Sequence, residues 1–307
     1  MRRFKDILFV ADESPGQAQA FARALRLAEE NQSGITVMDV VDDLSDMPQY
    51  YSAADQEKLI EQRRKSLSQF IGKAAGATQG VSIGIEVREG RPFIEVIRTV
   101  LKNNHDLVIK APNSGMGRIQ RLFGSMDIRL MRKCPCPVWI VKPSDHKHFA
   151  RILAAVDPDP NNPYADSLNR LILELATSLA ELENSKLDVV HAWEVYGEVA
   201  LRGGQLPKGA VARIQEEMRE AHEKEMKELL APFSSIDKTV HLANGDAGDE
   251  IIDLAIKNNV DLVVMGTVGR SGIPGLIIGN TAEKVIHGID CSLLAVKPAG
   301  FVTPVDK

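Results

Sequence analysis

Short apolar runs alternate with longer amphipathic segments along the whole chain. Each run has four to six residues and is rich in Val, Ile and Leu. Several runs are apolar at successive positions, which is typical of strands buried on both faces. Such alternation of strands and helices predicts a parallel sheet with right-handed crossovers and helices on both faces. The predicted strands are 7–11, 36–41, 83–87, 107–110, 138–141, 152–156, 187–192, 240–243, 262–265 and 293–296, and 17–31 and 249–259 are among the predicted helices.

The same pattern occurs twice. Residues 4–12 (FKDILFVAD) resemble residues 149–157 (FARILAAVD). From Gly90 to Pro143 the two halves match without a gap at an offset of 155, so that KNNHDLV at 102–108 falls on KNNVDLV at 257–263. This register indicates a tandem duplication. A chain of 307 residues also suits two domains of about 150 residues each. We predict one domain over 1–145 and a second over 150–307, joined by a short polar linker.

Composition narrows the class of protein. The chain is 44% hydrophobic, which supports buried cores, and its net charge of -5 argues against general binding of nucleic acid. Three cysteines in a chain of this length do not indicate a disulfide framework, so a reducing compartment is favoured. No apolar stretch approaches the length of a membrane span. We therefore expect a cytoplasmic protein that binds neither nucleic acid nor membrane.

The stretch MGTVGRSGIPGLIIGNTA (265–282) is the strongest candidate site. Gly266 and Gly269 follow a predicted strand, and Gly279 precedes a helix that Asn280 or Thr281 would cap. The N–H groups and dipole at a helix start favour an anion, and glycines let a phosphate approach the main chain. A mobile loop that closes onto a capped helix is the alternative. The P-loop motif and a complete G-x-G-x-x-G motif are both absent from the sequence.

The spacing Gly266-x2-Gly269-x9-Gly279, followed by Asn280 and Thr281, resembles the ATP-binding signature of the universal stress protein family. The duplicated chain is similar to the tandem members of that family. This resemblance implies a Rossmann-like α/β fold of the adenine nucleotide alpha hydrolase type. Each half would hold an open five-stranded parallel sheet of order 3-2-1-4-5. The family pairs through its last strand, so an intrachain pseudo-dimer is expected at 138–141 and 293–296, and a further homodimer is left open.

The resemblance also implies an ATP site in the second half, with or without Mg²⁺. The carboxylate of Asp157 would contact adenine or ribose, and the alternative for this residue is a helix cap. The family commonly has Ser or Thr where Asn280 stands, although an amide also donates hydrogen bonds. Arg270 lies beside a loop glycine and is a candidate phosphate contact. The predicted ATP-binding residues are Ala155, Val156, Asp157, Ala192, Met265, Gly266, Gly269, Arg270, Gly279, Asn280, Thr281 and Ala282.

The first half has lost part of this loop. Where the second half has its first two loop glycines, the first half has Ala111 and Ser114, and Pro112 removes an N–H donor. Side chains at these positions would crowd a phosphate, so nucleotide is predicted mainly in the second half. Lys110 replaces Met265. A solvated surface role is expected for it and for Arg118, and binding of a different anion is the alternative.

Three functions remain open at this stage. The first is a nucleotide-binding stress-response sensor or regulator. The second is a slow ATPase, which is disfavoured because the sequence offers no evident catalytic base or arginine finger. The third is an interaction scaffold with a small-ligand pocket in the first half. No catalytic residue is predicted, and no metal site, because the spacings Cys134-x-Cys136 and His146-x-His148 do not match the usual zinc patterns.

Overall fold

The computed structural model describes residues 4–74, 80–113, 122–144, 146–159, 162–194, 210–234, 236–268 and 278–306. In the first half the elements are β1 (Asp6–Val10), α1 (Gln17–Asn31), β2 (Gly34–Val41), η1 (Leu44–Asp46), α2 (Ala53–Ala74), β3 (Ile83–Glu89), α3 (Pro92–Asn103), β4 (Leu107–Lys110), α4 (Ser125–Lys133) and β5 (Val138–Ile140). In the second half they are β6 (Arg151–Ala155), α5 (Pro163–Glu183), β7 (Lys186–Trp193), α7 (Ala210–Leu230), η3 (Ala231–Phe233), β8 (Lys238–Asn244), α8 (Ala247–Lys257), β9 (Leu262–Gly266), α9 (Asn280–Gly288) and β10 (Ser292–Val296).

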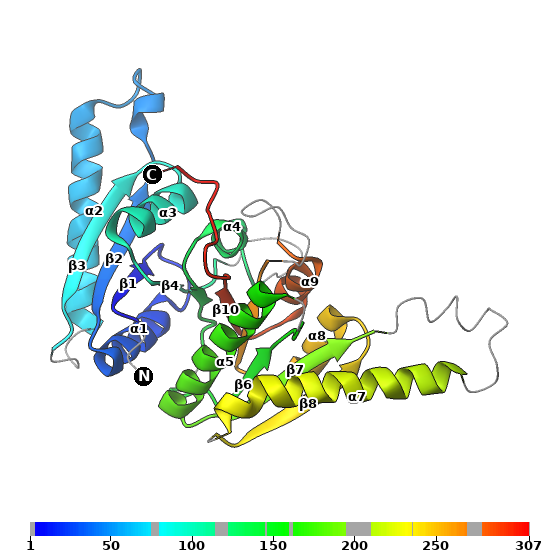
Figure 1. Cartoon of the computed structure of the whole chain (residues 1–307). Coiled ribbons are helices and arrows are strands. Elements are labelled where there is room, and N and C mark those ends of the chain that lie inside the picture. Colours follow the sequence, from blue (N-terminus) through cyan, green and yellow to red (C-terminus); the bar gives the residue numbers. More distant parts are fainter. Residues whose placement is uncertain are drawn as a thin grey trace.

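The strands of these ranges form a ten-stranded sheet of order β3-β2-β1-β4-β5-β10-β9-β6-β7-β8 (Figure 1). Within each half the strands are parallel and follow the order 3-2-1-4-5, which confirms the predicted fold class. The two five-stranded half-sheets are joined by antiparallel pairing of β5 with β10, which makes the sheet continuous. This pairing joins the two segments that the sequence predicts at the junction of the halves.

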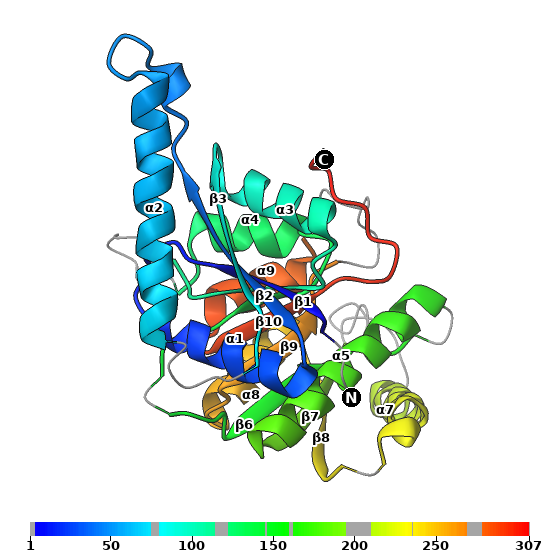
Figure 2. The ribbon, with the colours of Figure 1, turned by 90° about the vertical axis from the view of Figure 1, so that its left-hand side faces the viewer.

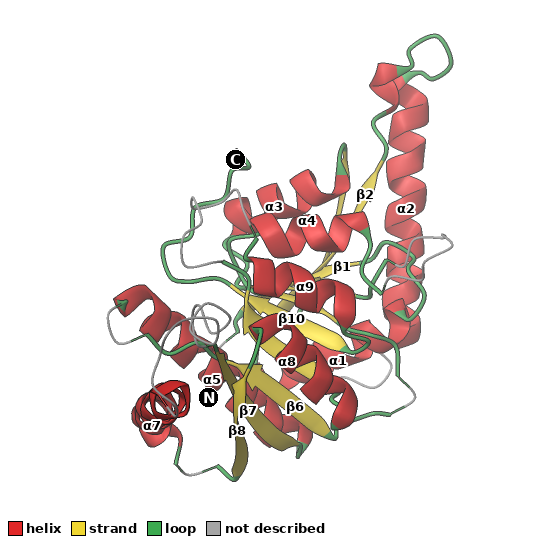
Figure 3. Ribbon diagram, turned by 90° about the vertical axis from the view of Figure 1, so that its right-hand side faces the viewer, coloured by secondary structure: helices red, strands yellow, loops and turns green. Residues whose placement is uncertain are grey.

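Helices cover both faces of the sheet (Figures 2 and 3). Successive strand residues point to opposite faces, so Ile7 and Phe9 of β1 pack with α1, α2, α5 and α7 in one core cluster. Leu8 and Val10 belong to a second cluster, which α3, α4, α8 and α9 complete. Burial of alternating residues on both faces accounts for the uninterrupted apolar runs in the strands.

The junction between the halves is antiparallel and buried. Trp139 of β5 lies opposite Leu294 of β10, and both side chains are about 1% exposed. The Trp139 ring also packs against Phe149 at a centroid distance of 6.0 Å. Because this pairing uses the inner edge of each half-sheet, no unpaired strand edge remains there to invite association.

A buried carboxylate holds the helices of the two halves together. Glu183 at the end of α5 is 1% exposed and pairs with Arg23 of α1 at 3.1 Å and with Arg26. The second oxygen of Glu183 accepts a hydrogen bond from the amide of Phe149 at 3.1 Å. Arg23 lies over the Phe149 ring at 3.8 Å and donates to the carbonyl of His146 at 3.0 Å. The linker is therefore clamped between α1 and α5.

Two equivalent lysines also cross the junction. Lys297 follows β10 and is 5% exposed, and its ammonium group donates to the carbonyl of Met131 on α4 and to the hydroxyl of Thr267. Thr267 itself donates to Met131 at 3.1 Å. Lys142 of the first half donates to the carbonyl of Asp290 at 2.7 Å and is a third exposed. Burial lowers the pKa of Lys297 to about 7.

Replacing Glu183 with Ala should lower the free energy of unfolding by about 3–5 kcal/mol, because two arginines at a buried site lose their carboxylate partner. Urea denaturation measures the change. Glu283→Ala is the matched control: Glu283 also crosses the junction, to Arg132 at 3.5 Å, but is half exposed. Its loss should amount to less than about 1 kcal/mol. Equal effects of the two substitutions would contradict the clamp.

Replacing Lys297 with Met should flatten the pH dependence of stability above neutrality. Between the folded pKa of about 7 and the ordinary value of 10.5, the unfolded chain binds the additional proton, so this lysine makes stability rise with pH. The slope is at most about 1.4 kcal/mol per pH unit. Denaturation of wild type and variant from pH 6.5 to 9.5 measures it. The exposed Lys142→Met should retain the wild-type slope, and a Lys297→Met slope equal to wild type would refute the assignment.

Candidate functional site

The carboxyl ends of three adjacent strands bring most of the predicted site residues to one edge of the sheet. Ala155 ends β6 and pairs in register with Val190 of β7 and with Met265 of β9. Val156 and Asp157 follow β6 directly, and Gly266 ends β9. In parallel sheets ligands bind beyond these strand ends, where the strand order reverses. Gly269 and Arg270 lie outside the described residues.

Ala192 lies on β7, one residue before its end, and pairs with Ala243 of β8. The remaining predicted residues open α9: Gly279 is the N-cap residue, and Asn280, Thr281 and Ala282 form the first turn.

The start of α9 lies beside the end of β9. The Gly279 amide donates to the carbonyl of Thr267 at 3.1 Å, and the Thr267 amide donates to Val296 of β10 at 3.2 Å. Gly279 is therefore held directly beside the end of β9. A Cβ on Gly266 would lie 2.7 Å from a methyl group of Leu168 on α5. A side chain at this position would therefore displace the end of Leu168 on α5.

The expected capping of α9 by Asn280 or Thr281 is wrong. Both residues lie inside the helix, and Gly279 precedes them with φ -65° and ψ 145° and with no side-chain cap. The amides of the first helical turn keep the positive end of the helix dipole, which favours a negatively charged group. Glu283, in that same turn, donates its amide to the Gly279 carbonyl at 2.9 Å.

Asp157 presents its carboxylate from a fixed backbone. Its amide donates to the side-chain oxygen of Asn169 at 2.9 Å, and the Asn169 amide group donates to the Asp157 carbonyl at 2.8 Å. Asn169 is 3% exposed, whereas the Asp157 side chain is half exposed. The alternative role as a helix cap is not seen, because α5 begins only at Pro163. Sequence reasoning missed Asn169, since nothing in a local pattern links residues 157 and 169.

The equivalent site in the first half is filled by side chains of the chain itself. Lys110 is fully buried, which corrects the expected surface role. Its ammonium group contacts Asp127 at 2.6 Å, Asp12 at 3.1 Å and the Ala111 carbonyl at 2.6 Å. Asp12 follows β1 as Asp157 follows β6, and Lys110 stands where the second half has Met265. Arg118 lies outside the described residues.

Asp127 supplies the anion at the start of α4. One of its carboxylate oxygens accepts hydrogen bonds from the amides of Asn113 at 2.9 Å and Gly124 at 2.8 Å. A Cβ on Gly124 would lie 2.0 Å from the Asn113 carbonyl oxygen, so the backbone of Asn113 packs directly against the start of α4. In the second half Ala282 occupies the position of Asp127 and offers no carboxylate. The two halves thus differ in charge at the start of the helix that follows the fourth strand.

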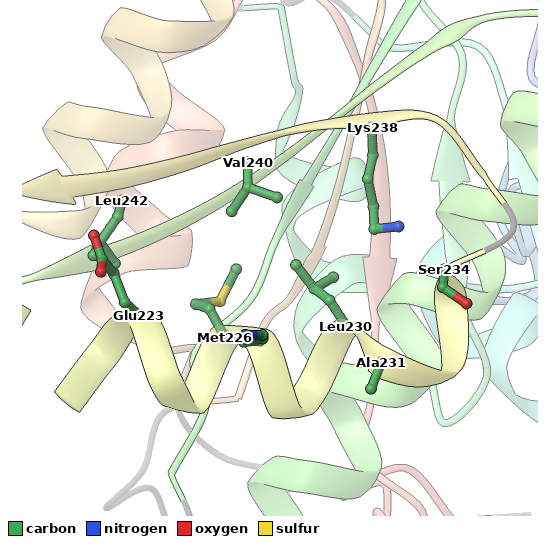
Figure 4. Close-up of a pocket in the computed structure, with 9 residues that line it drawn as sticks. Glu223, Met226, Leu230, Ala231, Ser234, Lys238, Val240 and Leu242 are labelled. Atoms are coloured by element: carbon green, nitrogen blue, oxygen red, sulfur yellow. The ribbon is translucent and has the colours of Figure 1, made fainter. Parts of the chain in front are cut away.

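A groove of about 460 Å³ lies away from these residues, at the outer edge of the sheet (Figure 4). Met226 and Leu230 of α7 point toward Val240 and Leu242 of β8, so its lining is mainly apolar. None of the predicted site residues lines it. The groove therefore does not coincide with the candidate site.

The described part of the chain contains no group of three or more His, Cys, Asp or Glu residues placed to hold a metal ion. Nor does any helix within it combine the length and apolar character needed to cross a membrane.

Comparison with known proteins agrees with this fold. A sequence model of the universal stress protein family matches residues 3–142 and again residues 148–297. The universal stress protein E homolog of Haemophilus influenzae is 32% identical over 97% of this chain and 98% of its own length. Universal stress protein E of Escherichia coli is 30% identical over 100% of this chain and 98% of its own length.

Two solved structures share the fold across both halves. A functionally unknown protein from Pseudomonas aeruginosa has a TM-score of 0.72 and 23% identity, covering 97% of this chain and 94% of that one. A universal stress protein from Archaeoglobus fulgidus has a TM-score of 0.61 and 20% identity, covering 95% and 98%. With two family matches and relatives of the same length, the chain belongs to the universal stress protein family, in its tandem form.

Proposed function

We propose that the second domain, residues 150–307, binds an adenine nucleotide, with ATP as the expected ligand. One observation carries the proposal: Asp157 is held by Asn169 at the end of β6, and its half-exposed carboxylate can accept hydrogen bonds from adenine or ribose. The residues assigned to the ligand are those predicted from the sequence. Ala155, Val156 and Ala192 would line the nucleoside, and Met265 and Gly266 would border the ribose.

The phosphates would lie toward the start of α9. Support comes from the first turn of this helix, which has a glycine N-cap and no side-chain cap. Main-chain N–H groups and the helix dipole stabilise phosphate oxygens at such a position. Gly279, Asn280, Thr281 and Ala282 are the proposed contacts from the helix. Gly269 and Arg270 are proposed from the sequence pattern alone, and Mg²⁺ would bridge the phosphates.

The first domain, residues 1–145, would not bind nucleotide. Lys110 and Asp127 place an internal ion pair at the positions that Met265 and Ala282 hold in the second domain. The amides of Asn113 and Gly124 already bind the Asp127 carboxylate. A phosphate would have to displace this buried carboxylate. The Lys110 ammonium group would then lose its partner, and an unpaired buried charge carries a large desolvation cost.

A sensor or regulator in the cytoplasm is the role that this arrangement favours over an enzyme. Phosphoryl transfer requires charge neutralisation and a positioned nucleophile near the terminal phosphate. Asp157, the carboxylate assigned to the ligand, is assigned to its nucleoside end instead. Slow hydrolysis remains the alternative, and release of inorganic phosphate from ATP by the purified chain is its direct test.

Titration calorimetry with ATP should give one site per chain. Asp157→Ala should weaken binding by about tenfold to a hundredfold, because hydrogen bonds to a charged group contribute about 1.5–3 kcal/mol. Gly279→Val should abolish the heat, since a branched side chain would stand at the helix start.

Asp12→Ala is the matched control for that experiment. It removes the equivalent carboxylate from the first domain and should leave ATP affinity within about twofold of wild type, since affinity tracks only contacts made to the ligand. Two ATP per chain would refute the asymmetry between the domains. Heat retained by Gly279→Val would place the ligand elsewhere, and no heat with wild type would refute nucleotide binding.

The internal ion pair of the first domain can be tested by its stability. Asp127→Ala alone should cost about 3–5 kcal/mol, because it leaves the Lys110 ammonium group buried with Asp12 as its remaining carboxylate contact. The double variant Lys110→Met/Asp127→Ala copies the second domain and should recover most of that loss. Urea denaturation of the single and double variants measures the coupling. Additive losses would show that the two side chains do not act as a pair.

A further inference from the structure

Strand β8 ends the sheet, and its outer edge has no strand partner within the described residues. The amide of Gly245, directly after β8, donates to the carbonyl of Trp193 on β7 at 3.0 Å. Since alternate residues of a strand bond to the same neighbour, the main-chain groups of Val240 and Leu242 face outward, away from β7. Such a row of open N–H and C=O groups is a template on which another strand can pair.

The opposite end of the sheet differs from β8 in charge. β3 ends the sheet there, and the offset of 155 residues that relates Gly90 to Gly245 also aligns β3 with β8. Charged side chains on an edge strand oppose pairing with another chain. The second half lacks the charges that protect the equivalent edge of the first half: where β3 has Glu86, Arg88 and Glu89, β8 has His241, Ala243 and Asn244.

The lysine of β8 does not protect the edge in their place. The ammonium group of Lys238 donates to the carbonyls of Phe233 at 2.6 Å and Ile236 at 3.1 Å, so its charge is held at the start of the strand. His241 lies on the other face of the sheet from Lys238 and bonds Asp188 at 3.1 Å. Neither side chain obstructs a strand laid along the middle of β8.

The apolar side chains of this edge are incompletely covered. In the first half Ile83, Ile85 and Val87 of β3 pack against the core cluster that contains Leu67 of α2. The counterpart of Ile85 is Val240, which is 45% exposed. Beside it, α7 and β8 leave open the apolar groove of about 460 Å³ (Figure 4). An exposed valine beside an open groove marks this edge as a contact surface.

We propose that the chain forms a symmetric dimer in which β8 pairs antiparallel with β8 of a second copy. A two-fold axis at His241 would place Val240 of each copy opposite Leu242 of the other, and Lys238 opposite Asn244. Val240 and Leu242 both have outward main-chain groups, so these opposite residues exchange hydrogen bonds. The two grooves then meet across the axis. The proposal does not depend on nucleotide binding.

The contact is self-complementary, as a two-fold axis requires. An axis at Val240 would set the charged Lys238 opposite Leu242, whereas the axis at His241 pairs apolar side chains twice. Glu223 and Lys227 both line the groove, one turn apart on α7, so an antiparallel α7 of the partner can set each charge beside the opposite one. The junction of β5 with β10 shows that this sheet already extends by antiparallel pairing of strand edges.

Sedimentation equilibrium of the full chain, at concentrations up to the high micromolar range, tests the dimer. Wild type should dimerise, and Val240→Glu should weaken association by at least about a hundredfold, because the symmetric contact buries an unpaired carboxylate twice. Val302→Glu is the matched control, since Val302 is 69% exposed and lies in the segment after β10. It should associate like wild type. Both valines are exposed, so both variants should keep the wild-type circular dichroism.

A cross-link tests the register. Residues opposite each other at a position without hydrogen bonds have Cα atoms about 4.5 Å apart, within the range that a disulfide spans. His241→Cys should therefore form a disulfide between two chains in oxidised glutathione, and Val240→Glu added to it should abolish the cross-link. The natural cysteines are buried and do not compete. Val302→Cys should give no cross-link.

Each outcome decides the proposal. A wild type that stays monomeric at the highest concentration would overturn it, as would a dimer that Val240→Glu leaves intact. A dimeric His241→Cys without a cross-link would overturn the register. If wild type is monomeric and binds the apolar dye ANS more strongly than Val240→Glu does, the groove belongs to a small apolar ligand and the dimer is refuted.

Discussion

The antiparallel pairing of β5 with β10 is the contact on which the rest of the molecule depends. It turns two half-sheets into one sheet of ten strands and buries Trp139 between the halves. Family members with one domain can make such a contact only between two chains, whereas the duplication places both edges in one chain. The pairing also determines which side chains of the two halves come into contact. Glu183 can bind two arginines of the other half, and Lys297 can reach Met131, only because the strands between them are joined.

Covalent linkage allows the two domains to diverge, because each no longer needs to serve as its own partner. The first domain keeps the strand order and the glycine before α4 but fills its site with Lys110 and Asp127. The carboxylate of Asp127 accepts hydrogen bonds from the amides of Asn113 and Gly124, beside the start of α4. A buried ion pair contributes little stability relative to apolar side chains, so its main physical effect here is to occupy the site. The second domain has apolar residues, Met265 and Ala282, at the same two positions.

The same divergence appears at the second strand of each domain. Asp39 and Arg63 form an ion pair in the first domain, and His191 and His222 share a hydrogen bond in the second. Both pairs hold a long helix against the sheet. The histidine pair lies beside Asp157, a carboxylate with half of its surface in solvent. The same strand position therefore holds a salt bridge in one domain and a contact between two rings in the other.

The sequence alone determined the duplication, the fold class and the strand order within each half, because these follow from apolar periodicity and from the family pattern. It also indicated that Asp157 and Gly266 would lie at neighbouring strand ends, since parallel strands bring their carboxyl ends to one edge. It did not determine the burial of Lys110, the clamp of Asn169 on Asp157 or the contact of His191 with His222. Each of these depends on side chains from different elements, and a lysine in a strand gives no local sign that two carboxylates surround it. Only the tertiary structure decided those contacts. A buried charged or polar group needs a hydrogen-bond partner, and here the partner comes from a segment that is distant in the sequence.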